Sequence, residues 1–162
     1  MDDIFNTVLV RAAGIPAGHQ LAGALAGRSN IIELTEKSHD AALIPEPPGG
    51  LTHSLRAALA CRMAHLNHEA GLASHYESMI AAEDALTADP NFVGAGDPWL
   101  SAVIRHTDLV TRSPKDAAAG DIESLETVGI PVEDIVRLSE LIAFVNYQVR
   151  VVAGLRLMVE AS

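Results

Sequence analysis

The sequence has little cysteine, few aromatic residues and a deficit of positive charge. Among its 162 residues there is one cysteine, 4% aromatic residues, and 11 Lys and Arg against 21 Asp and Glu, for a net charge of −10. The single cysteine, Cys61, excludes an internal disulfide, a CxxC redox pair and a cysteine-rich zinc cluster. The few, scattered cations argue against binding to nucleic acid or to an anionic membrane surface, because both need clustered positive charge.

A basic leader and a long uncharged apolar run are not found either. The uncharged stretch Leu141–Val149 is far shorter than the roughly 20 residues that span a bilayer. The first residues, Met1-Asp2-Asp3, are acidic where a signal peptide is basic. We therefore expect a cytoplasmic protein without a membrane span.

Strand signals are nearly absent, whereas helical periodicity runs through most of the chain. No stretch alternates apolar and polar residues, and no Asn-Gly or Asp-Gly hairpin turn occurs. Alanine is abundant, and 49% of the residues are apolar, which is enough for a sizeable core. The sequence predicts an all-α fold.

The chain divides at a proline-rich segment. Residues 45–50, Pro-Glu-Pro-Pro-Gly-Gly, cannot be helical, because proline fixes φ and lacks an N–H donor. We interpret residues 1–50 as an N-terminal arm with short helices, one capped by Asp2 and one within His19–Ala26, that wraps a neighbour or covers the helices after it. Residues 51–162 form the helical domain.

Capping residues predict where the helices of this domain begin and end. Starts are expected at Thr52, at Asp97-Pro98 and at Ser113-Pro114, the last with Asp116 near a capping-box position. Breaks are expected at Asn67 and at Gly129, before a final helix opened by Pro131.

The final helix is apolar on nearly all sides between Ile135 and Leu155. Such a helix is buried on most of its surface, either as the central helix of a domain or against a subunit neighbour. We expect both, and therefore a homo-oligomer. The alternative is a central helix in a monomer.

Within that helix, Phe144, Asn146 and Arg150 follow a "Phe, Asn, then Arg four residues later" pattern. This pattern, with the helix–Pro–helix–Gly layout before it, resembles the carboxymuconolactone decarboxylase / alkylhydroperoxidase D-like superfamily over roughly residues 51–158. The resemblance implies an all-α, alkylhydroperoxidase D-like fold that assembles as trimers or hexamers. It also suggests a CxxC-containing relative as a partner.

The catalytic motif of that family is incomplete in this chain. Family peroxidases carry Cys-x-x-Cys-x-x-x-His with a Glu about a dozen residues upstream. Aligned on His75, the two cysteine positions hold His68 and Gly71, and the upstream Glu position falls on or beside Arg56. The dithiol peroxidase cycle is therefore not available by its usual route, and no cofactor is implied.

Three residues are candidate catalytic groups. His75 occupies the family's proton-relay position and is either a general base, with His68 as a possible partner, or a satisfied histidine in a helix interface. Cys61 is either a one-cysteine peroxidase or redox sensor, with a histidine lowering its pKa, or a small buried apolar residue.

Asn146 and Arg150 are candidate substrate-binding residues. Arg150 either anchors an anionic substrate or pairs with an acidic side chain such as Asp108 or Glu140. The densest group of potential metal ligands is His65, His68, Glu69 and His75. Its spacing is not a metal motif, so we predict no metal site.

Two functions remain open from the sequence. The first is an oligomeric binding or partner subunit of a peroxidase-related system that lacks the redox cysteines. The second is a small-molecule enzyme that uses His75, with His68 or Arg150, on a peroxide, lactone or carboxylate.

Overall fold

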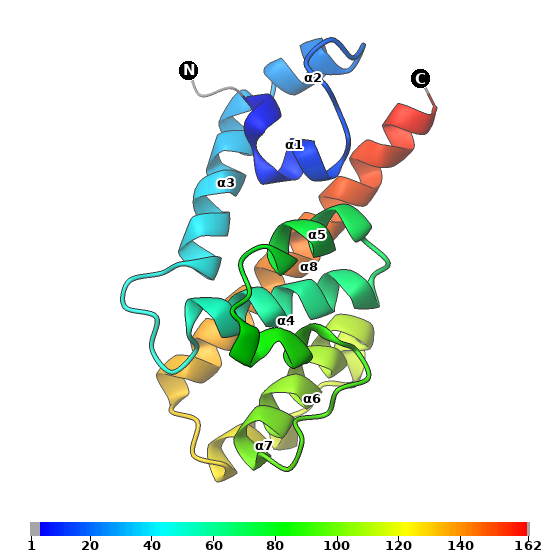
Figure 1. The fold of residues 1–162 in the computed structure, drawn as a ribbon. Coiled ribbons are helices and arrows are strands. Elements are labelled where there is room, and N and C mark those ends of the chain that lie inside the picture. Colours follow the sequence, from blue (N-terminus) through cyan, green and yellow to red (C-terminus); the bar gives the residue numbers. More distant parts are fainter. Residues whose placement is uncertain (1–3, 162) are drawn as a thin grey trace.

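Helices form the framework of the protein. The computed structural model describes residues 4–161 and has no β-strand within that range (Figure 1), which confirms the all-α prediction. Eight α-helices and three short 3-10 helices follow one another there: η1 (Ile4–Asn6), α1 (Val8–Ala12), α2 (Ala22–Ala26), α3 (Ser29–Leu43), α4 (His53–Leu66), α5 (Ala70–Glu77), η2 (Ala82–Ala88), α6 (Pro98–Arg112), η3 (Pro114–Asp116), α7 (Ala119–Thr127) and α8 (Val132–Glu160).

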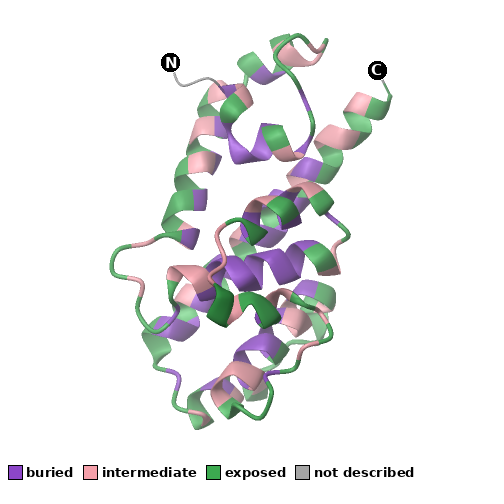
Figure 2. Cartoon of the chain, viewed as in Figure 1, coloured by how far each residue is buried: buried purple, intermediate pink, exposed green. Residues whose placement is uncertain are grey.

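Helix α4 is the centre of the core. Every residue from Leu55 to Ala64 is buried (Figure 2), and the helix packs against α5, α6 and α8. Four alanines in this stretch let the neighbouring helices come close. The last helix was expected to be central and buried on most sides; α8 does pack against α1, α3, α4, α6 and α7, but it also has an exposed side, with Val136 and Tyr147 on it.

Most of the predicted helix ends are confirmed. Thr52 caps α4 by accepting a hydrogen bond from the N–H of Leu55 at 3.1 Å, and Asp97 caps α6 at the N–H groups of Trp99 and Leu100. Helix α4 ends before Asn67. Helix α7 ends before Gly129, whose φ of +86° is a left-handed value that glycine adopts without strain.

The helix predicted to start at Ser113-Pro114 is wrong, because only a short turn forms there. Pro114–Asp116 form a single 3-10 turn, and Ala117 and Ala118 are then extended, with ψ of 134° and 166°. The next helix, α7, begins at Ala119. Its cap is the carboxylate of Asp121, not that of Asp116, and it accepts from the N–H of Ala118 at 2.9 Å.

The described part of the N-terminal segment is largely helical and lies in the main core. Helix α1 buries Val8, Leu9 and Val10 against α5 and α8. The sequence reasoning does not identify α3, whose buried residues Ile32, Thr35, His39 and Leu43 recur every three or four positions. The predicted cap at Asp2 lies outside the described residues.

The proline-rich connector is non-helical, as predicted, and α4 holds it in place. Buried Arg56 donates hydrogen bonds to the carbonyl oxygens of Ala42, Pro48 and Leu51 at 2.9–3.0 Å. Arg56 thus ties residues 42–51 to the central helix.

Helix α8 is long, and its last turns project past the rest of the fold (Figure 1). By length and composition α8 could cross a membrane, although core helices of soluble proteins meet the same criterion. The uncharged stretch Leu141–Val149 is too short by itself to predict that the whole of α8 meets this length criterion.

Candidate functional site

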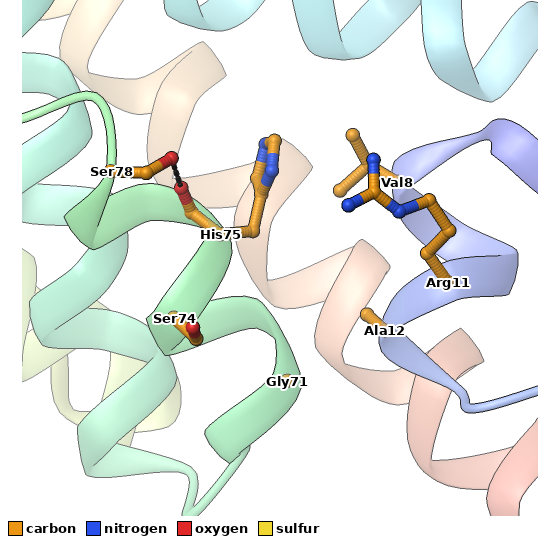
Figure 3. Close-up of a pocket in the computed structure, with 7 residues that line it drawn as sticks. All are labelled: Val8, Arg11, Ala12, Gly71, Ser74, His75 and Ser78. Atoms are coloured by element: carbon orange, nitrogen blue, oxygen red, sulfur yellow. Dashed lines mark hydrogen bonds between the residues drawn. The ribbon is translucent and has the colours of Figure 1, made fainter.

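A pocket of about 430 Å³ lies between α1 and α5. Figure 3 shows the ring of His75 from α5 on one wall and the side chains of Val8 and Arg11 from α1 opposite. Ser74 and Ser78 also line it, and the Ser78 hydroxyl donates to the carbonyl oxygen of His75 at 2.6 Å. The pocket therefore combines one titratable base, one cation and two serines.

Close contact between α1 and α5 forms the floor of the pocket. A Cβ atom on Gly71 would lie 2.6 Å from the carbonyl oxygen of Ala12, so only glycine permits this approach. Arg156 of α8 fixes the arrangement, because it donates to that same oxygen at 3.0 Å and to the buried carboxylate of Glu69 at 2.5 and 2.9 Å. Three helices are thus fastened at one end of the pocket.

His75 is hydrogen-bonded to a second histidine behind the pocket wall. Its Nε2 lies 3.0 Å from Nε2 of His39, which comes from α3 and is 5% exposed. The other ring nitrogen of His39, Nδ1, lies 3.0 Å from Oδ1 of Asp40. The Asp40 side chain is 60% exposed, so the chain Asp40–His39–His75 runs from solvent to the pocket.

Burial keeps His75 neutral at physiological pH. Desolvation is the main cause that lowers its pKa from 6.5 to about 4, and the charges of His39 and Arg11 act in the same direction. A neutral imidazole has a lone pair that can accept a proton. His75 is therefore in the state that a general base requires.

Aromatic residues hold this histidine pair between three helices. Tyr76, fully buried on α5, donates a hydrogen bond to Oε1 of Gln148 on α8, and its ring stacks 6.1 Å from that of His39. Phe144 of α8 approaches His39 edge-on, with ring centroids 6.3 Å apart. The ring of His39 therefore has little freedom to turn away from His75.

The other predicted catalytic residues lie away from this pocket. His68 is exposed at the turn between α4 and α5, with φ of +57°, and does not line it. Cys61 is buried on α4, where its Sγ lies 3.5 Å from the carbonyl oxygen of Ala73. Burial, followed by the charge of Glu77, raises the pKa of the Cys61 thiol to about 11, so it stays protonated.

The two predicted substrate-binding residues do not line the pocket either. Asn146 is buried and donates to the carbonyl oxygen of Ile142 at 2.9 Å and to Oγ1 of Thr111 at 3.3 Å. Arg150 is exposed and donates to the backbone oxygen of Asn146 at 2.8 Å. Asp108, one of the acids considered for Arg150, instead binds Arg62.

The histidine-rich segment is dispersed by the break after α4. His65 is on α4 and His68 follows the helix end, so they do not share a helix face, and Glu69 is engaged by Arg156. Within residues 4–161, no group of three His, Cys, Asp or Glu side chains is placed to hold a metal ion.

Sequence reasoning missed three residues of the site: Arg11, His39 and Asp40. His39 follows Ile32 by seven residues and Thr35 by four, which is the spacing of one helix face. A histidine on the buried face of an amphipathic helix is a detectable signal, but its pairing with His75 depends on how α3 packs.

Comparison with protein-family models, curated proteins and solved structures gives no match for this chain.

Proposed function

We propose that this protein is a small-molecule enzyme that performs acid–base chemistry without a thiol, with His75 as the general base. The observation that carries the proposal is the hydrogen-bonded chain Asp40–His39–His75, which ends in the wall of the pocket. In this proposal the alkylhydroperoxidase D-like scaffold keeps its pocket histidine, and the redox cysteines are lost.

The chemistry of the pocket lining supports a small anionic substrate. Arg11 supplies a guanidinium group opposite the His75 ring, and the pocket is large enough for a molecule of about ten heavy atoms. A carboxylate held by Arg11 would bring its neighbouring C–H or O–H group toward His75. A neutral base and a fixed cation suit removal of a proton next to a carboxylate.

The Cys61→Ser variant tests the proposal that catalysis does not use the thiol of Cys61. We expect this variant to turn over the same substrates as the unaltered protein, within about twofold, because the protonated, buried thiol is a poor nucleophile. The measurement is a screen of small carboxylic acids, lactones and peroxides by NMR, with a dithiol donor added in the peroxide arm. Dithiol-dependent peroxide consumption that disappears in Cys61→Ser would refute the proposal.

A second candidate is an oligomeric subunit, either a trimer or hexamer of this chain or a partner of a CxxC-containing relative. The exposed apolar side chains at the end of α8 favour it, since Leu157 is 64% and Met158 is 48% exposed. A second copy of this chain packed on the projecting turns would bury both side chains.

The oligomer is tested by light scattering after size-exclusion chromatography. We expect the unaltered protein to run as a trimer or hexamer and the double variant Leu157→Glu/Met158→Glu to dissociate, because charge cannot be buried without a partner. Val93→Glu, at a residue that is 72% exposed, is the matched control and leaves the assembly intact. A monomeric unaltered protein at micromolar concentration contradicts this candidate.

A further inference from the structure

We infer that His39 and Asp40 are positioning residues that fix the tautomer of His75 and carry a proton away from the pocket. The inference rests on the proposed function of His75 and adds two residues to it. It is drawn from the two 3.0 Å contacts that join Asp40, His39 and His75, and from the burial of His39 between α3, α5 and α8.

The carboxylate of Asp40 determines the tautomers of the two histidines that are hydrogen-bonded in series to it. Asp40 can only accept a hydrogen bond when ionised, so Nδ1 of His39 carries the proton and donates to it. In neutral His39, Nε2 is then the acceptor, and the hydrogen bond must come from Nε2–H of His75. This leaves the lone pair of His75 on Nδ1, the ring nitrogen not engaged by His39.

The transfer balances within these three residues and the substrate. A substrate proton moves to Nδ1 of His75, and its bonding electron pair stays on the substrate. The proton on Nε2 of His75 moves to Nε2 of His39, which becomes an imidazolium beside the carboxylate of Asp40. Return of a proton from Nδ1 of His75 to the product reverses these steps and restores both tautomers, so no other reactant is needed.

The groups around the pair support this direction of transfer. Burial, followed by the charges of His39 and of Arg11 on α1, lowers the pKa of His75 and disfavours a positive charge on it. The carboxylate of Asp40 on α3 lies 3.0 Å from Nδ1 of His39, where it would pair with an imidazolium. Helix α8 presents the uncharged ring of Phe144 to His39, and α5 presents the hydrogen-bonded phenol of Tyr76. The charge created by proton abstraction therefore settles on His39, away from the guanidinium.

The tautomers are measured directly by ¹⁵N NMR of the full-length protein at neutral pH. We expect His75 to be protonated at Nε2 and bare at Nδ1, and His39 to show the reverse. Asp40→Asn allows an amide N–H₂ group to face Nδ1 of His39, so the tautomer ratio of His75 should change by about tenfold. Glu33→Gln removes a carboxylate two turns earlier on the same helix and is the matched control, with no change expected.

A kinetic readout separates relay from mere support of the fold. With a substrate identified by the screen, Asp40→Asn should lower kcat about tenfold and leave KM unchanged, because Asp40 does not line the pocket. His75 protonated at Nδ1 in the unaltered protein, or an unchanged kcat in Asp40→Asn, overturns the relay while His75 can still be the base. Full activity in a His75 variant instead overturns the proposed function itself.

Discussion

His75→Gln is expected to lower kcat/KM for the protein's substrate by about 10²–10⁴-fold, the usual contribution of a general base. Glutamine can still hydrogen-bond to His39 through its side-chain amide, but it cannot accept a proton at neutral pH. The variant therefore tests the chemistry of the base with little change in packing. Turnover of the acid, lactone or peroxide identified by the screen is the quantity to compare.

The pH dependence adds a signature of the same group. Because a base must be unprotonated to act, and burial lowers the pKa of His75 to about 4, protonation of His75 itself should lower kcat/KM only below about pH 5. An ordinary exposed histidine would produce a fall near pH 6.5 instead. Circular dichroism at each pH separates this effect from unfolding.

His65→Gln is the matched control, since His65 is an exposed histidine on α4 outside the pocket. It should keep turnover within about twofold of the unaltered protein. If kcat/KM falls equally in His65→Gln and His75→Gln, or falls in neither variant, His75 is excluded as the base.

Arg62→Met is expected to cost about 3–5 kcal/mol of the free energy of unfolding, the typical effect of removing one partner of a buried ion pair. Arg62 is 1% exposed on α4 and forms a bidentate ion pair with Asp108 of α6, at 2.6 and 2.7 Å. It also donates to four carbonyl oxygens, that of Thr87 near the end of η2 and those of Asp89, Pro90 and Phe92 in the loop that follows. Methionine fills a similar volume but leaves all these acceptors without their donor.

Urea unfolding of Arg62→Met and of Arg105→Met provides the comparison. The side chain of Arg105 is 56% exposed, and its ion pair with Asp121 spans 3.7 Å, so its loss should cost no more than about 1 kcal/mol. Similar stabilities for the two variants would show that the buried network around Arg62 contributes little.

Local chemistry in the sequence was sufficient for much of the framework. Thr52 and Asp97 have side-chain oxygens that cap helix N-termini, and Gly129 tolerates a left-handed φ, so these helix ends could be predicted from single residues. The proline-rich connector could be predicted for the same reason. The helix predicted to start at Ser113-Pro114 was wrong, because one capping residue can start a turn but does not ensure that the next residues continue it as a helix.

The site could be predicted only in part. His75 stood out only through a resemblance to a known motif, but its partners Arg11 and His39 lie 64 and 36 positions earlier in the chain, within a segment whose local signals are weak. Arg150 looked like the buried cation of the last helix, whereas the buried arginines are Arg56 and Arg62 on α4. Which face of a helix is buried depends on its neighbours, and these are distant in sequence.

By itself the sequence determined the helical class, most helix ends and the absence of a dithiol pair, because composition, capping and cysteine count act through local or covalent chemistry. Only the tertiary structure decided that α3 brings His39 to His75 and that α1 brings Arg11 to the same pocket. Packing of distant helices sets these contacts, since each one depends on the burial of apolar faces that no short stretch of sequence contains.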